Sequence, residues 1–505
     1  MKFILNNDDI ATDLPAGTTV LDFVRYHKNL KGTKIGCREG DCGACTILVG
    51  ELKDSRVSYR TMTSCLMPLA NAEGKHIVTI EGINPSDGSL TPVQQAMIDE
   101  SGTQCGFCTV GFVMSLTGFC IDETPKTCEM AISSVDGNIC RCTGYKSIQR
   151  AADLLSRRSA DGEEQFVPEY FRSIYERLGD VRNQARTEIQ AAAGGSTIVG
   201  GGTDVYVQRP DEIVEAGATH VLYDDSLRGI GDDGTYVEIG ASATVTDLLE
   251  SPAMQSIFPD LYKHLKLVSS TPIRNMATLA GNFINASPIG DMTVWFLALD
   301  ADIIFDNGRE MPLRNLYIDY KRLAKTDNEF VRTIRFKKPA GNFYFNFEKV
   351  CKRTYLDIAT VNTAISLTIE STPGPGWVPP ALMDEAGLKD EGGRMKDENQ
   401  GRDLGLGTSS SFILPPSSFD KVDHVVIDAH VSAGGVSPIP LYLKETSDFL
   451  RGQVIDVQTI ADANEIMQAE ISPITDVRGS ADYKRLLLRQ LFRAHFLEMF
   501  DGPRN

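Results

Sequence analysis

The sequence predicts a multidomain α+β protein, and three observations support this class. The chain has 505 residues, too many for one hydrophobic core, so three or four domains of roughly 100–200 residues each are expected. Short runs of apolar residues in or near alternation, typical of strands, stand beside longer segments of helical character. Hydrophobic residues make up 42% and charged residues 23% of the chain, as in folded rather than disordered proteins.

Net charge and cysteine placement narrow the functional class. The formal net charge of −18 argues against a nucleic-acid partner or an anionic membrane, because both bind basic surfaces. No stretch approaches the roughly 20 apolar residues of a membrane-spanning helix, so a cytoplasmic location is expected. Ten of the eleven cysteines precede residue 143. Because structural disulfides are rare in a reducing compartment, this skew indicates ligands rather than core packing.

The first cysteine group lies between two expected strands, MKFILNN at the start of the chain and HIVTIEGI at residues 76–83. Three of its members stand in the loop KIGCREGDCGACTILVG, with the spacing C-x4-C-x2-C, and a fourth follows after nineteen residues. This spacing matches the plant-type pattern of 2Fe-2S centres. Glycines in the loop let the backbone bend tightly and point N–H groups at the sulfurs. The candidate ligands are Cys37, Cys42, Cys45 and Cys65, and the glycines are Gly36, Gly40 and Gly43.

Zinc is the main alternative for this first group. Zinc sites usually combine paired C-x2-4-C knuckles, and the x4-then-x2 spacing fits that arrangement poorly. We therefore expect an iron–sulfur cluster in this loop.

The second cysteine group stands in TQCGFCTVGFVMSLTGF and NICRCTGYKSIQRAADLL, next to expected helices over 109–119 and 145–157. Taken alone, a C-x2-C with a distant C-x-C leaves zinc open. Its place directly after a ferredoxin-like segment favours a second 2Fe-2S centre. The candidate ligands are Cys105, Cys108, Cys140 and Cys142. The remaining thiols, Cys120, Cys128 and Cys351, are expected in cores as small apolar residues.

The motifs QCGFCTVGFVMS and NICRCTGY, in this order and spacing, resemble the iron–sulfur part of the xanthine dehydrogenase (molybdenum hydroxylase) family. The resemblance implies a β-grasp, ferredoxin-like 2Fe-2S domain over residues 1–83 and a four-helix 2Fe-2S domain over residues 84–160. It also implies that Gln104 contacts the pterin of a molybdenum-binding partner.

Two later stretches have the character of a cofactor site. STIVGGGTDVYVQ (196–208) is an apolar strand that runs into three glycines, which would let backbone N–H groups approach a pyrophosphate. It is not the Rossmann fingerprint, because Val205 stands where the third glycine belongs. On these residues alone, a tight turn and a phosphate cradle both stay open. TPIRNMATLAGNFINASPIGDMTVWFLAL (271–299) combines flexible backbone with hydrogen-bonding side chains.

Both stretches resemble the flavin-binding part of the same family, which is of the vanillyl-alcohol-oxidase type. The resemblance implies a linker over 161–190, an FAD-binding domain over 191–340 and a C-terminal α+β flavoprotein domain over 341–505. Val199, Gly200, Gly201, Gly202, Thr203, Asp204 and Val205 would hold the FAD pyrophosphate, and Thr278, Asn282 and Asp291 its phosphate, ribityl or ribose portions. Lys349 is expected near the flavin ring and Val331 at a backbone contact.

The C-terminal part contains an insertion and a final helix. Residues 372–423 are rich in Gly, Pro, Ser and charge, and they separate segments that lie close together in the family pattern, so an exposed, irregular insertion is expected. VRGSADYKRLLLRQLFRAHFLEMF has the apolar periodicity of an amphipathic helix.

The resemblance implies the small, iron–sulfur and FAD-binding subunit of the family. Its cofactors would be two 2Fe-2S clusters and FAD, with NAD as acceptor and molybdopterin on a large partner subunit, in a heterotetramer of two small and two large subunits. Electrons from hypoxanthine or xanthine oxidation to urate would pass from molybdenum to the helical-domain cluster, the ferredoxin-domain cluster, FAD and NAD. No residue of this chain is expected as a catalytic base.

Three alternatives stay open. In the first, the chain serves another molybdenum hydroxylase, which acts on aldehydes or heterocycles. In the second, oxygen or ferredoxin replaces NAD as the electron acceptor. In the third, the chain is a zinc-binding scaffold without catalytic activity that uses the same cysteines.

Overall fold

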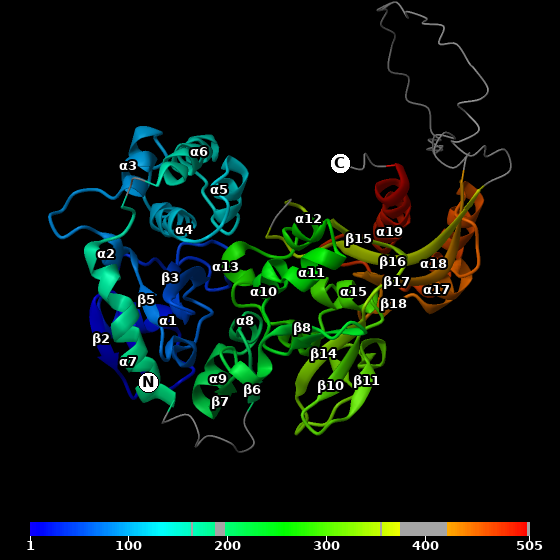
Figure 1. Ribbon diagram of the computed structural model, residues 1–505, viewed down its shortest axis with the longest axis horizontal. Coiled ribbons are helices and arrows are strands. Elements are labelled where there is room, and N and C mark those ends of the chain that lie inside the picture. Colours follow the sequence, from blue (N-terminus) through cyan, green and yellow to red (C-terminus); the bar gives the residue numbers. More distant parts are fainter. Residues whose placement is uncertain (163–164, 187–196, 354–355, 374–421, 502–505) are drawn as a thin grey trace, which may run out of the picture.

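The computed structural model describes residues 1–505 except 163–164, 187–196, 354–355, 374–421 and 502–505. Successive parts of the chain follow one another along its long axis (Figure 1). The N-terminal part, in blue and cyan, lies at one end, the green middle part follows, and the orange and red C-terminal part lies at the other end. Within the described residues, the helices are too short or too polar for any of them to cross a bilayer.

The first part is a five-stranded sheet of order β2-β1-β5-β3-β4, in which β1 and β5 are parallel. A short helical segment packs on it through Phe23, which stacks edge-on against Phe3. Of the stretch 76–83, only His76–Val78 is a strand, whereas residues 80–83 form a helical turn, so the expected strand was wrong beyond Val78. The elements are β1 (Lys2–Leu5), β2 (Asp8–Ala11), α1 (Val20–Asp22), η1 (Phe23–His27), β3 (Thr46–Lys53), β4 (Arg56–Thr63), η2 (Leu69–Ala72), β5 (His76–Val78) and α2 (Ile80–Ile83).

The second part is a bundle of four helices that packs on β3. The first of these helices begins with a capping box at Thr91 and has a proline in its first turn. Both features favour the start of a helix. The second helix is apolar on nearly every face and is buried at the centre of the bundle, where such helices are stable. The helices are α3 (Pro92–Asp99), α4 (Thr109–Ile121), α5 (Cys128–Ser134) and α6 (Lys146–Asp161).

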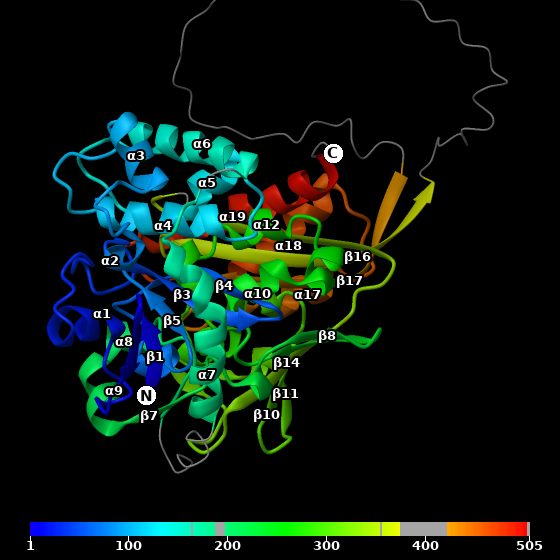
Figure 2. The same ribbon diagram turned by 60° about the vertical axis from the view of Figure 1, so that its left-hand side comes forward.

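The range expected as a linker, 161–190, contains structure of its own. After η3 (Glu169–Ser173), helix α7 (Ile174–Arg186) runs along the ferredoxin-like sheet (Figure 2). Ile174 and Leu178 are four residues apart and therefore share one helix face. Both are fully buried against Ile4 of β1. The chain thus crosses the back of the first part before it reaches the middle part.

The middle part combines a small parallel pair, β6 and β7, with a five-stranded sheet of order β11-β10-β14-β9-β8. Short helices cover this sheet, and their apolar residues form the largest core, around Trp295. The elements are β6 (Thr197–Val199), α8 (Val205–Gln208), α9 (Pro210–Ala216), β7 (Ala218–His220), η5 (Asp225–Leu227), β8 (Ile230–Asp232), β9 (Tyr236–Gly240), α10 (Val245–Glu250), α11 (Pro252–Ile257), α12 (Leu261–Leu265), α13 (Thr271–Arg274), α14 (Leu279–Asn285), α15 (Asp291–Leu297), β10 (Asp302–Phe305), β11 (Glu310–Pro312), η6 (Leu313–Asn315), β12 (Tyr317–Asp319), β13 (Arg322–Leu323) and β14 (Val331–Lys337).

The C-terminal part is an antiparallel four-stranded sheet of order β15-β16-β17-β18 with helices packed on it (Figures 1 and 2). The long strands β16 and β17 pair along their length, with Asn362 opposite Gly434 at one end and Pro373 opposite Val422 at the other. Nearly all of the expected insertion, residues 374–421, lies outside the described residues. The elements are β15 (Asn342–Val350), β16 (Val361–Pro373), β17 (Val422–Gly434), β18 (Leu441–Tyr442), α17 (Lys444–Leu450), α18 (Val457–Glu470), α19 (Ala481–Phe496) and η7 (Leu497–Asp501).

Candidate iron–sulfur and flavin sites

The first cysteine loop folds as a tight cradle between η1 and β3. The Cys37 amide donates to the Cys42 sulfur at 3.4 Å, and the Glu39 amide donates to the Cys37 sulfur at 3.3 Å. Gly43 has a φ of +66°, in the region that glycine adopts without strain. A side chain there would also collide with the neighbouring helical domain, because a Cβ would stand 2.4 Å from the Gly137 carbonyl oxygen.

The four predicted thiols of the first set form two pairs. The Cys42 thiol hydrogen-bonds the sulfur of Cys37 and lowers the pKa of Cys37 to about 5. Cys65 acts in the same way on Cys45, whose pKa is lowered although both thiols are buried. Thiolates are the metal-binding form of cysteine, and a 2Fe-2S cluster takes two protein ligands on each iron. The pairing therefore fits such a cluster.

The second set of predicted thiols is also paired. The sulfurs of Cys105 and Cys142 are 3.6 Å apart, and Cys108 interacts with Cys140. Cys105 and Cys142 are exposed, whereas Cys140 is buried. The Cys140 amide donates to the Tyr145 hydroxyl at 3.0 Å, which fixes the loop that leads into α6.

Pairs of thiols differ from the ligand shell of a single ion. Among the residues that the structure describes, no three His, Cys, Asp or Glu side chains converge closely enough to hold one metal ion. A two-iron cluster spreads its four ligands over two metals, with two protein ligands on each iron.

The three thiols outside these sets differ in burial. Cys120 is buried in α4, as expected for a core residue, and Cys351 is half-buried. Cys128 is exposed at the start of α5, so its expected place in a core was wrong. The Thr127 side chain caps this helix by accepting a hydrogen bond from the Met130 amide.

Backbone hydrogen bonds join the two thiol sets. The Ile139 amide, one residue before Cys140, donates to the Cys42 carbonyl oxygen at 3.1 Å. The buried Asn138 side chain donates to the Gly43 carbonyl at 3.2 Å and accepts from Ser115 at 2.8 Å. Cys42 of the first set is thus connected to Cys140 of the second set through one hydrogen bond and one residue, Ile139.

The glycine stretch after β6 forms the floor of a cavity of about 890 Å³. A Cβ on Gly201 would lie 1.7 Å from the Met276 carbonyl oxygen, and one on Gly200 would lie 2.4 Å from the Thr278 hydroxyl. Only glycine permits the chain to pack this closely on residues 276–278. Of the residues expected to bind FAD, ten line this cavity, namely Val199, Gly200, Gly201, Gly202, Thr203, Asp204, Val205, Thr278, Asn282 and Val331.

The other two expected residues, Asp291 and Lys349, lie outside that lining and pair with each other at 2.6 Å. Lys349 is only 1% exposed, and it also donates to the Leu267 carbonyl at 2.8 Å. Asn362 donates to Asp291 at 2.6 Å, while its own side-chain oxygen is buried without a partner. A buried acceptor without a donor is rare in folded proteins, and a flavin has an N–H donor, so this region fits the cofactor.

Sequence reasoning missed part of the cavity wall. The loop 325–330 and residues 241–242 also line it. The polar run KTDNEF directly before Val331 was a signal for a loop, but nothing in it indicates which wall of a cavity it forms.

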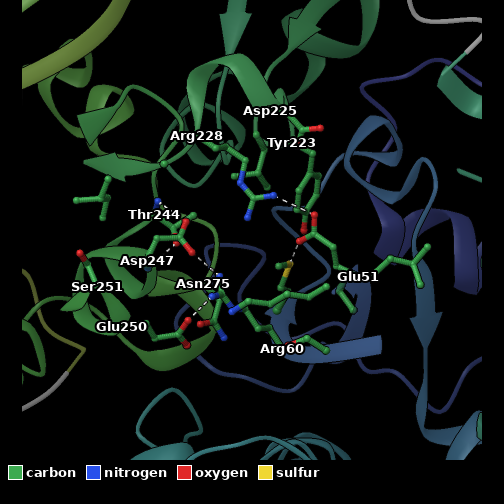
Figure 3. Close-up of a pocket in the computed structure, with 18 of the residues that line it drawn as sticks. Glu51, Arg60, Tyr223, Asp225, Arg228, Thr244, Asp247, Glu250, Ser251 and Asn275 are labelled. Carbon is green, nitrogen blue, oxygen red and sulfur yellow. Dashed lines mark hydrogen bonds and ion pairs between the residues drawn. The ribbon is translucent and has the colours of Figure 1, made fainter. Parts of the chain in front are cut away.

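A second cavity, of about 530 Å³, separates the ferredoxin-like sheet from the middle part (Figure 3). Arg60 of β4 reaches across it to Asp247 at 2.9 Å and Glu250 at 2.6 Å. Glu51 of β3 accepts from Arg228 at 2.9 Å. Burial pushes the pKa of Glu51 upward, but Lys75 and Arg228 together lower it below its usual value. Charged pairs therefore connect the two parts across this cavity.

Comparison with known families gives matches for four successive stretches of the chain. Residues 3–70 match the family described as 2Fe-2S iron-sulfur cluster binding domain, and residues 79–153 match the 2Fe-2S binding domain. Residues 182–338 match the FAD binding domain in molybdopterin dehydrogenase. Residues 417–499 match the CO dehydrogenase flavoprotein C-terminal domain.

Similar whole proteins were also found. Xanthine dehydrogenase of Emericella nidulans is 29% identical over 74% of this chain and 33% of its own length. Xanthine dehydrogenase 1 of Arabidopsis thaliana is 24% identical over 96% of this chain and 38% of its own length. The chain thus spans between a third and two fifths of the relatives it matches.

Among solved structures, carbon monoxide dehydrogenase from Hydrogenophaga pseudoflava has 20% identity and a TM-score of 0.45, covering 62% of this chain and 91% of that chain. Quinoline 2-oxidoreductase from Pseudomonas putida 86 has 18% identity and a TM-score of 0.44, covering 61% of this chain and 90% of that chain.

The domains, the two cysteine sets and the glycine-lined cavity define an iron–sulfur flavoprotein. The chain belongs to the molybdenum hydroxylase family and contains its two 2Fe-2S domains, its FAD-binding domain and its C-terminal flavoprotein domain.

Proposed function

We propose that this chain carries electrons from a molybdenum site on a large partner subunit to NAD while hypoxanthine and xanthine are oxidised to urate. When bound, the two 2Fe-2S clusters supply one-electron steps, and FAD supplies the conversion to two-electron hydride chemistry. The observation that carries the proposal is the hydrogen bond between the Ile139 amide and the Cys42 carbonyl at 3.1 Å, because it connects the two ligand sets directly.

The outer end of this route supports a partner subunit. Cys105, Cys142 and Gln104 are all exposed, and the neighbouring Phe107 and Tyr145 expose 49% and 37% of their surface. Protein interfaces are enriched in aromatic residues such as Phe and Tyr. In the proposal the large subunit covers this surface, Gln104 contacts its pterin, and two small and two large subunits assemble.

The inner end supports the flavin. The glycine stretch from Gly200 to Gly202 brings backbone N–H groups to the cavity floor, where they suit a pyrophosphate. Thr278 and Asn282 line the same cavity. We place the flavin ring toward Lys349 and Asp291, because their ion pair is a buried charged group that a polar ring edge can contact.

The proposal is tested with the purified chain and with its partner. Visible iron–sulfur and flavin absorption is expected, whereas a colourless, zinc-loaded protein would support the scaffold alternative instead. The chain alone should oxidise NADH with a one-electron dye but should not oxidise xanthine. Adding the large subunit should restore xanthine-dependent NAD reduction, and xanthine turnover by the isolated chain would overturn the proposal.

A variant at the partner-facing end separates the two activities. Gln104→Leu should slow the coupled xanthine reaction and leave NADH–dye activity unchanged. Gln458→Leu is the matched control, because Gln458 is an exposed glutamine of α18 in the C-terminal part. Equal loss of both activities in Gln104→Leu would place this residue in the flavin half of the route.

One alternative keeps the architecture and changes the chemistry at its ends. Residues 417–499 match a family described from CO dehydrogenase, so another substrate of a molybdenum hydroxylase, such as an aldehyde or a heterocycle, is the second candidate. Oxygen or ferredoxin can likewise replace NAD as acceptor. Assaying the assembled enzyme against purines, aldehydes and N-heterocycles, with each acceptor in turn, decides between these possibilities.

A further inference from the structure

One buried ion pair joins the helical iron–sulfur domain to the FAD-binding part. The Arg274 guanidinium donates to Asp136 at 2.6 Å, and the two side chains are only 5% and 2% exposed. Arg274 ends α13 in the FAD-binding part, whereas Asp136 follows α5 in the helical domain. The pair therefore crosses a domain boundary without contact with solvent.

The pair is held on both sides by further hydrogen bonds. The second carboxylate oxygen of Asp136 accepts from the Thr271 amide at 2.8 Å. Arg274 also donates to the Thr271 hydroxyl at 2.7 Å and to the Val268 carbonyl at 2.9 Å. A planar guanidinium with several fixed acceptors permits little rotation. The relative position of the two segments is consequently well determined.

The segments on either side of the pair reach the cofactor sites. Asp136 begins the loop that contains Asn138 and Ile139, the two residues that hydrogen-bond the Cys42–Gly43 backbone, and that ends at Cys140. On the other side, Asn275 donates to the Thr61 carbonyl of β4 at 2.8 Å. The carbonyl of the next residue, Met276, packs against Gly201 of the flavin loop, residues 199–205. One ion pair thus lies between all three cofactor sites.

We propose that Asp136 and Arg274 are positioning residues for electron transfer. They fix the loop 136–140 so that the hydrogen bond from Ile139 to Cys42 forms and the second thiol set keeps a constant distance from the first. Electron transfer falls steeply with distance, so a looser loop slows transfer between the clusters. The inference rests on the proposed function, because it requires both clusters and FAD in this chain.

The test uses the full chain with its cofactors and the double variant Asp136→Asn with Arg274→Met. Removing both charges together avoids an unpaired buried charge, so the fold is expected to persist. Iron, sulfide and FAD contents are measured first. Reduced wild-type protein should show magnetic interaction between the two clusters by electron paramagnetic resonance, and this interaction should weaken in the variant. Hydrogen exchange at the Ile139 amide should become about tenfold faster.

Two further variants control for a purely structural effect. Thr271→Val removes the hydrogen bond from Arg274 to the Thr271 hydroxyl and the bond from that hydroxyl to the Ser133 carbonyl, and it leaves both charges in place. It should change exchange and magnetic interaction in the same direction as the double variant, so it replaces the double variant if that protein does not fold. Lys266→Met is the control, because it breaks an ion pair with Glu129 at 3.2 Å across the same boundary, and the Glu129 side chain is 70% exposed. This variant should change neither hydrogen exchange nor magnetic interaction.

The possible results separate the inference from the proposed function. A wild-type chain that binds neither two clusters nor FAD overturns both. A wild-type chain with all three cofactors, together with folded variants that keep normal exchange and magnetic interaction, overturns the positioning role alone. A Thr271→Val chain that keeps the wild-type melting temperature but shows weaker magnetic interaction between the clusters supports the positioning role.

Discussion

Gly201 shows at the scale of one residue how the flavin loop depends on a missing side chain. A Cβ there would stand 1.7 Å from the Met276 carbonyl oxygen. We expect Gly201→Ala to displace the loop and weaken FAD binding by about 1–3 kcal/mol, the usual effect of overpacking. The measurement is FAD retained per mole of iron. Gly231→Ala is the control, since no atom lies within 4 Å of its added Cβ. Equal FAD retention in both variants would contradict the assignment of the loop.

Cys42 tests the separation of the two ligand sets. Serine at this position removes the thiolate that the cluster requires, so Cys42→Ser should eliminate one of the two 2Fe-2S signals in electron paramagnetic resonance. Cys128→Ser, which changes an exposed thiol, should keep both signals. Two intact signals in Cys42→Ser would show that the ligand set is wrong.

At the residue scale, the sequence predictions rest on local patterns. The C-x4-C-x2-C and C-x2-C spacings and the three glycines after β6 are local patterns; the structure pairs the thiols of each set and places the glycines along one cavity. Lys349 and Asp291 are 58 residues apart, and Arg274 and Asp136 are 138 apart. Such pairs depend on the path of the whole chain, which no local pattern contains.

At the scale of elements, apolar periodicity predicted the helices better than the strands. The expected helices over 109–119 and 145–157 correspond to α4 and α6. The apolar run at 76–83 continues past its strand, because three residues suffice to pair with β1 and β3 before the chain turns into α2. Helix α7 was missed because its buried face contains few apolar residues and the surrounding sequence is polar.

A buried histidine pair makes the packing of α12 and α19 on β15 sensitive to pH. Asn346 joins the two imidazoles, at 3.1 Å to His264 and 3.0 Å to His495. Burial lowers the pKa of His264 to about 4 and that of His495 to about 3. The folded protein keeps both rings neutral, whereas the unfolded chain binds protons below about pH 6.5. Stability should therefore fall as pH decreases from about 6.5 to about 4, by roughly 3 kcal/mol for His264.

The variant His264→Gln separates this contribution from general acid sensitivity. Its melting temperature should fall less steeply than that of the wild type between about pH 7 and about pH 5. His27→Gln changes an exposed histidine and should keep the wild-type slope. Identical slopes in all three proteins would show that the buried pair does not set the pH dependence.

At the scale of the whole molecule, the ferredoxin-like part depends on charged contacts across the cavity of Figure 3. Arg60→Met leaves Asp247 and Glu250 without their shared partner. Because the Arg60 side chain is 22% exposed, we expect a loss of about 1–3 kcal/mol, below that of a fully buried pair. Urea unfolding followed by flavin fluorescence measures it.

The control for this interface is Arg172→Met, which breaks an ion pair with Glu169 whose partners are 74% and 84% exposed. Exposed pairs of this kind contribute at most about 1 kcal/mol. A loss no larger in Arg60→Met than in Arg172→Met would show that the charges around the cavity do not hold the two parts together.

The paired thiols also determine the order in which this protein must mature. Cys105 and Cys142 are exposed, and their sulfurs are 3.6 Å apart, so before iron arrives they lie within easy reach of a disulfide. An oxidant that removes two electrons and two protons from this pair would leave only Cys108 and Cys140 for the cluster. If these thiols hold the proposed cluster, newly made chains need iron and sulfide before they meet oxidants, and a chain oxidised first would need a reductant before it could be loaded.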